Sequence, residues 1–331
     1  TVYTADQGLP PDGATFIEAG RDGSVWAGGD GWMARFDGAL TTFPVPNPNA
    51  YPFYHVAVGP DGTVWAAFGT DEFARFDGSE WQMLDPPSFA EPPTEWASDL
   101  AVAPDGTVWV GLPDESMGSE SSDVSRGVAS FDGTTWTVYA AADGLPPRVG
   151  NRIAVAPDGT VWAGSTGWVG ADGSSVSGGG AASFDGAVWT GYTIADGLPS
   201  NDVDMVIGAD GSVWAVAAYG AGVSRFDGTT WVAHPELDGS GVVDAEGRFW
   251  MPSDEGIVGH DGEQTIRLVV PVDESTAVTS TTAIVPAVGE WNPILATTRA
   301  APAAAAATCP PGADPNAPGS ATQQRPAAGW A

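Results

Sequence analysis

The sequence of 331 residues contains no lysine, three histidines and a single cysteine, Cys309. One cysteine cannot form an intrachain disulfide, and no cysteine–histidine cluster with metal-site spacing is present. No apolar run approaches the ~18 residues that a membrane helix needs. P-loop, nucleophile-elbow and HExxH motifs are missing as well. These absences argue against direct membrane insertion and leave no familiar catalytic motif, so we expect a protein that is not an enzyme.

Positive charge is also scarce. The chain has 42 aspartates and glutamates against 11 basic residues, all arginine, and its net charge is −31. Such a surface repels phosphate backbones and anionic lipid headgroups, which argues against nucleic acid and membrane surfaces as partners. The acidity favours solubility, and it leaves cations and small neutral polar ligands open.

What the chain does contain is a repeat. The pattern Asp-Gly-(Ser/Thr)-Val-Trp occurs five times, and a degenerate sixth copy reads Glu-Gly-Arg-Phe-Trp. Each copy is followed by Phe-Asp-Gly or, in the last copy, by His-Asp-Gly. The copies end at Trp26, Trp65, Trp109, Trp162, Trp214 and Trp250. Their spacing is close to the ~40–50 residues of a four-stranded propeller blade. The repeat therefore predicts an array of one supersecondary unit.

The fourth repeat shows the predicted unit most clearly. Its β-branched and apolar runs are residues 151–156, 160–165, 180–184 and 188–193. Pro157-Asp158-Gly159 has the residue types of a tight hairpin turn, and nothing reads as a helix. A single sheet would leave the repeated tryptophans in water, so neighbouring sheets must stack on them. Radial stacking predicts an all-β propeller of four-stranded antiparallel blades.

The ends of the chain bear on the blade count. Thr1-Val2-Tyr3 matches Thr137-Val138-Tyr139, an expected outermost strand, so it either completes the last blade or follows sequence that has been removed. We expect six blades in residues 1–270, with residues 271–298 as extra strands or part of an alternative seventh blade. Residues 299–331 are rich in alanine and proline, which predicts a disordered linker or tail to a larger polypeptide.

Residues 196–228 combine Asp-Gly-Leu-Pro, Asp-Gly-Ser-Val-Trp and Gly-Val-Ser-Arg-Phe-Asp-Gly. This phrase resembles the repeat of the two-component regulator propellers, and the similarity covers residues 1–262. The resemblance implies an extracytoplasmic sensor module, extracellular or periplasmic, and some members recognise carbohydrate. Pro-Asp-Gly-Thr-Val-Trp is also similar to repeats of the streptogramin lyases, which implies an alternative metal-assisted chemistry. No lyase motif matches a position here, so no site residue is carried over.

One position in each predicted inner strand varies among polar types. Six residues before the turn acid lie Phe16, His55, Asp99, Arg152, Asp204 and Ser240. Repeated architecture would place these side chains at one mouth of a central channel, where His55, Asp99, Arg152 and Asp204 could bind a polar ligand. The alternative is that they satisfy one another by ion pairing.

The longest predicted links gather on one face and carry further candidates. Trp32, Trp96 and Trp168 are tryptophans that the repeat does not require, and they could stack on sugar rings. The loop at residues 112–126 holds four clustered carboxylates, which suit a hard cation such as calcium. These residues are Asp114, Glu115, Glu120 and Asp123. A solvated acidic loop, and tryptophans that fill gaps under loops, are the alternatives.

The sequence therefore predicts a secreted or periplasmic binding or sensor propeller, with an oligosaccharide or another small polar molecule as ligand. The enzymatic alternative is a metal-assisted lyase or hydrolase that uses His55 with Asp99 or Asp204. A third alternative is a structural or adhesive repeat module.

Overall fold

The structure is a computed structural model of the whole chain. It describes residues 14–20, 22–29, 31–45, 53–68, 72–84, 97–112, 127–165, 167–169, 175–176, 178–253 and 256–269. Predictions that concern residues 1–13 or 270–331 lie outside this part of the chain.

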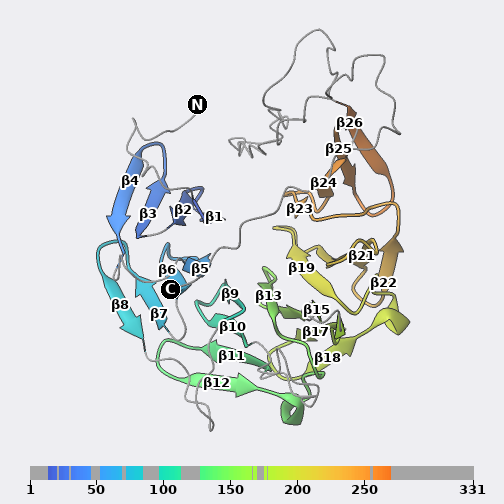
Figure 1. Cartoon of the computed structure of the whole chain (residues 1–331), viewed down its shortest axis with the longest axis horizontal. Helices are drawn as coiled ribbons and strands as arrows, with labels where there is room; N and C mark the ends of the chain where they lie inside the picture. Colours follow the sequence, from blue (N-terminus) through green and yellow to red (C-terminus); the bar gives the residue numbers. More distant parts are fainter. Residues whose placement is uncertain are drawn as a thin grey trace, which may run out of the picture. The chain divides into compact units, whose positions relative to one another are not determined.

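Six four-stranded antiparallel sheets make up most of the described residues (Figure 1). The first sheet has β1 (Phe16–Ala19), β2 (Val25–Gly29), β3 (Trp32–Phe36) and β4 (Leu40–Pro44). The second has β5 (Phe53–Val58), β6 (Val64–Phe68), β7 (Glu72–Phe76) and β8 (Trp81–Leu84). The third has β9 (Asp99–Val102), β10 (Val108–Leu112), β11 (Gly127–Phe131) and β12 (Trp136–Tyr139).

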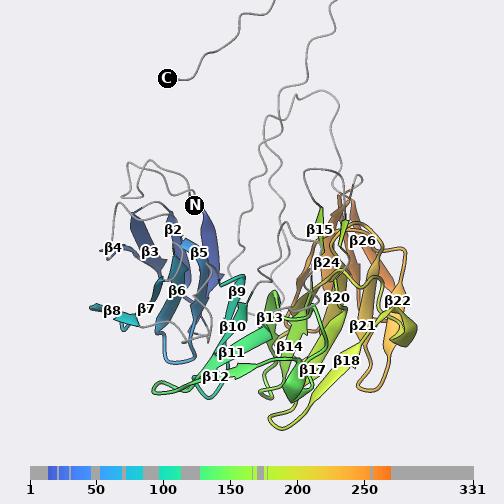
Figure 2. The same ribbon diagram turned by 60° about the horizontal axis from the view of Figure 1, so that its bottom comes forward.

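The second half of the chain repeats this order. The fourth sheet has β13 (Arg152–Val155), β14 (Val161–Gly164), β17 (Ala181–Phe184) and β18 (Trp189–Tyr192). The fifth has β19 (Val203–Ile207), β20 (Val213–Ala217), β21 (Val223–Phe226) and β22 (Trp231–His234). The sixth has β23 (Val242–Val243), β24 (Phe249–Ser253), β25 (Gly256–His260) and β26 (Thr265–Val269). Figure 1 shows the first strand of each sheet toward the centre and the fourth at the outside, and Figure 2 shows the same order from β9 to β12 in the third sheet.

The hairpin turns form as their residue types predict. Asp158 Oδ1 accepts a hydrogen bond from the Thr160 amide at 2.9 Å, and the Gly159 amide donates to the Ala156 carbonyl at 2.9 Å. Gly159 has a φ of 91°, a left-handed conformation that glycine adopts without steric cost. This local chemistry closes the β13–β14 hairpin and sets its register.

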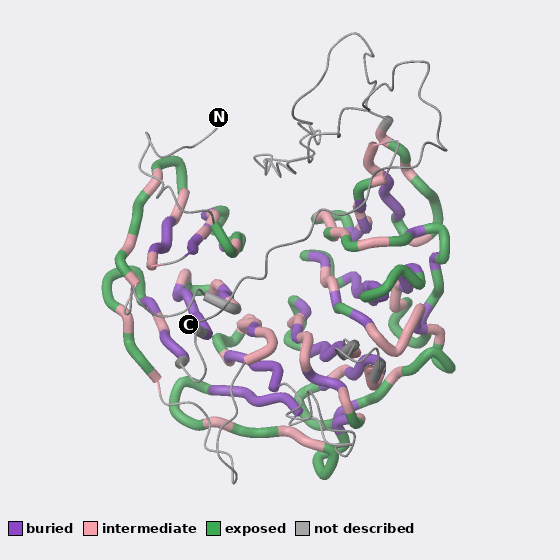
Figure 3. Tube along the Cα trace, viewed as in Figure 1, coloured by how far each residue is buried: buried purple, intermediate pink, exposed green. Residues whose placement is uncertain are grey.

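Tryptophans hold neighbouring sheets together. Trp162 on β14 contacts Tyr192 of its own sheet, and Phe226 and Trp231 of the next, at ring-centroid distances of 5.8, 5.1 and 5.6 Å. We call such a group of four side chains between two sheets an aromatic box. The box tryptophans Trp26, Trp65, Trp109, Trp162 and Trp214 are 0–8% exposed. Figure 3 shows the buried residues concentrated on the middle strands. The core is therefore a series of interfaces between sheets.

Several local elements were not expected from the sequence. The link between β14 and β17 contains a small hairpin, β15 (Trp168–Val169) and β16 (Ser175–Val176). Two 3-10 turns, η2 (Ala141–Asp143) and η3 (Ile194–Asp196), follow the fourth strands of the third and fourth sheets. Thr265–Val269 is the outermost strand of the sixth sheet rather than the beginning of a seventh.

The first sheet differs from the others in how its inner strand is covered. Ile17 on β1 is 58% exposed. Its counterparts Val56, Leu100, Ile153 and Met205 are each 6% exposed, because the preceding sheet packs on them. Residues 1–3, which the sequence predicts either to complete the last blade or to follow removed sequence, lie outside the described residues. Because β26 already forms the outermost strand of the sixth sheet, closure of the ring remains a prediction.

Candidate functional site

The inner strands bring the predicted polar residues together. His55 is on β5, Asp99 on β9, Arg152 on β13 and Asp204 on β19. His55 Nδ1 lies 3.6 Å from Asp99 Oδ1. Asp99 Oδ2 accepts a hydrogen bond from the Ile153 amide at 2.9 Å, which ties the third sheet to the fourth. We call Glu18, His55, Asp99, Arg152 and Asp204 the inner-strand polar group; Glu18 is discussed below.

Burial changes the protonation of this group. Burial raises the pKa of Asp99 to about 6, although hydrogen bonds from Ile153 and Leu100 and the charge of Arg152 act to lower it. Burial lowers the pKa of His55 to about 4, and the Arg152 guanidinium adds to this effect. His55 is therefore neutral at pH 7, and its contact with Asp99 is not an ion pair between charged partners.

Arg152 is the cation of the group. Its Nε is buried and has no hydrogen-bond partner among the described residues. A buried donor of this kind is uncommon, because leaving it unpaired costs desolvation free energy. Arg75 Nε and Arg225 Nε are buried and unpaired in the same way among the described residues, so the ion-pairing alternative weighed from the sequence stays open.

Glu18 on β1 belongs to the same group, and the sequence comparison missed it. Desolvation by the surrounding chain raises the pKa of Glu18 to about 7, with a further contribution from the negative charge of Asp99, although the residue is exposed to solvent. Glu18 pairs with Trp26 across β1 and β2. At the position that pairs with the repeat tryptophan, the next four sheets carry Ala57, Ala101, Ala154 and Val206. A single glutamate at a position that carries small apolar residues in the next four repeats was the sequence feature that could have identified Glu18.

Of the other predicted site residues, the structure describes the side chain of one and not those of the rest. Trp32 is 8% exposed, so its ring packs inside the protein and presents no face for a ligand to stack on. Trp168 lies on β15, but the structure does not describe its side chain. Trp96 and the predicted calcium ligands Asp114, Glu115, Glu120 and Asp123 lie outside the described residues. Calcium binding and stacking by Trp96 or Trp168 therefore remain predictions.

Among the described residues, the inner-strand polar group is not one of the clusters of His, Cys, Asp or Glu whose ligand atoms lie within 4.8 Å of one another. Within the described residues, one group of three His, Cys, Asp or Glu side chains could hold an ion, and it consists of His234, Glu236 and His260. The described residues also include no helix long and apolar enough to cross a membrane. The side chains of the inner-strand polar group are hydrogen-bond donors and acceptors for a ligand.

Comparison of structures bears on the fold. The chain is similar to apo AztD from Citrobacter koseri, with a TM-score of 0.51, 13% identity, and coverage of 80% of this chain and 78% of that chain. The six four-stranded sheets and this structural similarity both indicate a propeller. The chain has a β-propeller fold. Six blades, as expected from the repeat count, are confirmed.

Two further propellers are similar in structure. A streptogramin B lyase structure has a TM-score of 0.47 and 14% identity, covering 73% of this chain and 77% of that chain. A gluconolactonase, XC5397 from Xanthomonas campestris, has a TM-score of 0.46 and 17% identity, covering 74% and 85%. No family model and no curated protein matches the propeller sequence. The resemblance to two-component regulator propellers therefore remains a prediction.

Proposed function

We propose that this propeller is a binding module for a small neutral polar ligand, with an oligosaccharide as the first candidate. The carrying observation is the inner-strand polar group, in which five sheets each contribute one charged or titratable side chain. Glu18 and Asp99, with pKa values of about 7 and 6, present carboxyl groups that exchange between donor and acceptor near neutrality. Hydroxyl groups of a sugar use both roles.

Arg152 supports the same proposal. The Arg152 side chain is only partly buried, and its guanidinium offers charged N–H donors to a ligand oxygen. The group as a whole carries more carboxylates than cations, so it disfavours anionic ligands. A polyol therefore fits the site better than a phosphate or a carboxylate does.

The module is proposed to act outside the cytoplasm, as its sequence resemblance implies. Expression of the full natural protein with a fused reporter, followed by cell fractionation, tests this location. Recovery of the reporter only in the cytoplasm would refute it, and it would leave the ligand proposal untouched.

Binding is tested by titrating the chain with a panel of neutral oligosaccharides, using calorimetry. We expect Arg152→Gln to weaken the responsive sugar by about 10- to 100-fold, since a hydrogen bond from a charged donor contributes roughly 1.5–3 kcal/mol. Arg35→Gln is the matched control, because Arg35 forms ion pairs with Asp22 and Asp37 at 2.8 and 3.0 Å. A panel without binders, or equal affinities for Arg152→Gln and the parent, would sink the proposal.

A further inference from the structure

The aromatic box between the fifth and sixth sheets departs from the pattern of its neighbours. The preceding box consists of Trp162, Tyr192, Phe226 and Trp231. In the equivalent places of the next box stand Trp214, His234, His260 and Thr265. Two imidazoles thus replace a tyrosine and a phenylalanine, and a threonine replaces a tryptophan. The substitutions remove ring area and introduce nitrogen donors into a buried interface.

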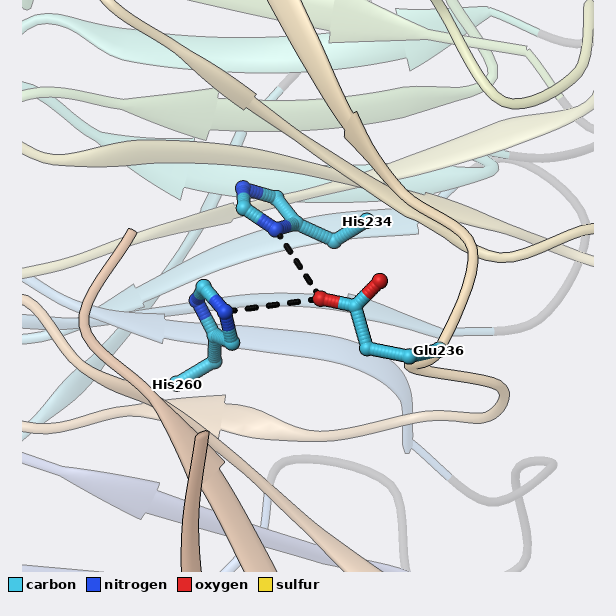
Figure 4. A group of neighbouring side chains, drawn as sticks. All are labelled: His234, Glu236 and His260. Atoms are coloured by element: carbon cyan, nitrogen blue, oxygen red, sulfur yellow. Dashed lines mark hydrogen bonds and ion pairs between the residues drawn. The ribbon is translucent and has the colours of Figure 1, made fainter. Parts of the chain in front are cut away.

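The two imidazoles meet a carboxylate. Glu236, which follows β22, places its Oε1 3.2 Å from His234 Nδ1 and 3.4 Å from His260 Nε2 (Figure 4). One ligand atom from each of the three residues lies within 4.8 Å of the others. In a tetrahedral zinc site, bonds of ~2.0–2.2 Å put neighbouring ligand atoms about 3.3–3.6 Å apart. The two contacts to Glu236, at 3.2 and 3.4 Å, are close to those edges.

The surroundings of His234, Glu236 and His260 leave part of their hydrogen-bonding capacity unused. His234 and His260 are 6% and 4% exposed, whereas Glu236 is exposed. His234 Nε2 is buried without a hydrogen-bond partner among the described residues. The imidazole rings lie 4.3 Å apart between centroids, and Trp214 covers His234 at 5.6 Å. The group therefore has two shielded nitrogen donors and an oxygen donor at the solvent side.

We propose that His234, Glu236 and His260 bind one divalent transition-metal ion of the zinc class. Two imidazoles and one carboxylate suit zinc and its neighbours rather than calcium or magnesium, which prefer oxygen ligands. Water or an external ligand would occupy the fourth position beside exposed Glu236. The ion would link β22 of the fifth sheet to β25 of the sixth. The high negative charge of the chain favours the approach of a cation.

Binding requires each imidazole to move the proton that it donates to Glu236 to its other ring nitrogen. His260 Nδ1 accepts a hydrogen bond from the Gly262 amide at 2.9 Å, which assigns the proton of neutral His260 to Nε2. A neutral imidazole that coordinates through Nε2 carries its proton on Nδ1 instead. Metal binding therefore releases the Gly262 hydrogen bond as the imidazole changes tautomer. This change moderates the affinity and makes the Gly262 amide resonance a reporter of binding.

The test uses the full chain after removal of metals with a chelator. Calorimetric titration with Zn²⁺ should give one equivalent bound, and Co²⁺ should develop visible absorption bands of a nitrogen-ligated tetrahedral site. His234→Tyr and His260→Phe restore the residue types of the preceding box, so these variants should fold. We expect each variant to weaken Zn²⁺ binding by at least about 100-fold. Loss of a residue that only supports a metal ligand costs about 10- to 100-fold in affinity, and each variant removes a ligand itself.

Glu263→Gln removes an exposed carboxylate in the turn between β25 and β26 and is the matched control. It should bind Zn²⁺ as the parent does and show the same rise in melting temperature with the metal. Equal binding by the parent and His260→Phe would overturn the proposal, as would a Co²⁺ spectrum without tetrahedral bands. Either result would leave the oligosaccharide proposal standing, because that proposal rests on other strands.

Discussion

His55 and Asp99 share one cause for their altered protonation, which is burial on the inner strands; Glu18 is exposed to solvent, and its pKa is raised by desolvation from the surrounding chain and by the charge of Asp99. The repeat alignment could predict His55 and Asp99, because equivalent positions of a repeat occupy equivalent places. Glu18 stands two residues further along its strand, on the same face as the aligned position. The protonation of these groups could not be predicted, because it depends on distances between different sheets.

Glu18→Gln tests the raised pKa of this carboxyl. Its pKa rises from 4.5 to about 7 on folding, so the stability that it contributes is complete below pH 4.5 and is lost as pH rises through 7. Glutamine cannot ionise, so from about pH 4 to pH 8 the variant should gain roughly 1 kcal/mol over the parent. This value allows for solvent screening of an exposed side chain.

Urea denaturation across this pH range measures the difference. Glu263→Gln controls for the loss of one negative charge at an exposed turn. Parallel pH curves for the parent and Glu18→Gln would contradict the raised pKa.

At the scale of elements, strands and turns followed the sequence closely. Predicted strands at 151–156, 160–165, 180–184 and 188–193 correspond to β13, β14, β17 and β18. Turn chemistry is local, so Pro157-Asp158-Gly159 contains the information for its own hairpin. The β15–β16 hairpin could not be predicted in the same way, because a two-residue strand has too few side chains to show alternation. The 3-10 turns are similarly short.

Trp162→Ala tests the aromatic box as a unit of stability. Trp162 is buried against three aromatic rings from two sheets, so truncation should lower the free energy of unfolding by about 3–5 kcal/mol. Val232→Ala on β22 is the control, because Val232 is exposed, and it should change stability by less than about 0.5 kcal/mol. Chemical denaturation measures both, and similar costs would mean that the boxes do not hold the sheets together.

At the scale of the whole molecule, the number of sheets follows directly from the repeat, whereas closure of the ring stays a prediction. Each sheet follows from its own copy of the repeat, whereas closure depends on contacts between chain segments far apart in sequence. The inner strands of successive sheets meet in the order β1, β5, β9, β13, β19 and β23. That order is what repeated units of one kind produce, and it is what gathers the inner-strand polar group.

The net charge of −31 has a measurable effect on this assembly. Like charges repel more strongly in the compact state than in the unfolded chain, and salt screens them within about 10 Å at 0.1 M. We expect the melting temperature at neutral pH to rise by several degrees, on the order of 1 kcal/mol, between low and moderate NaCl. An uncharged solute at equal osmolality is the control, and an equal rise with that solute would exclude charge screening as the cause.

The uncovered side chain of Ile17 has a consequence for the behaviour of concentrated solutions. An exposed apolar side chain that its counterparts bury can contact apolar surface on other molecules, and electrostatic repulsion between copies opposes that contact. Acidification titrates the carboxylates and weakens the repulsion while the apolar side chain stays the same. Colloidal stability should therefore fail on the acidic side of neutrality, and light scattering should detect the onset before the fold itself is lost.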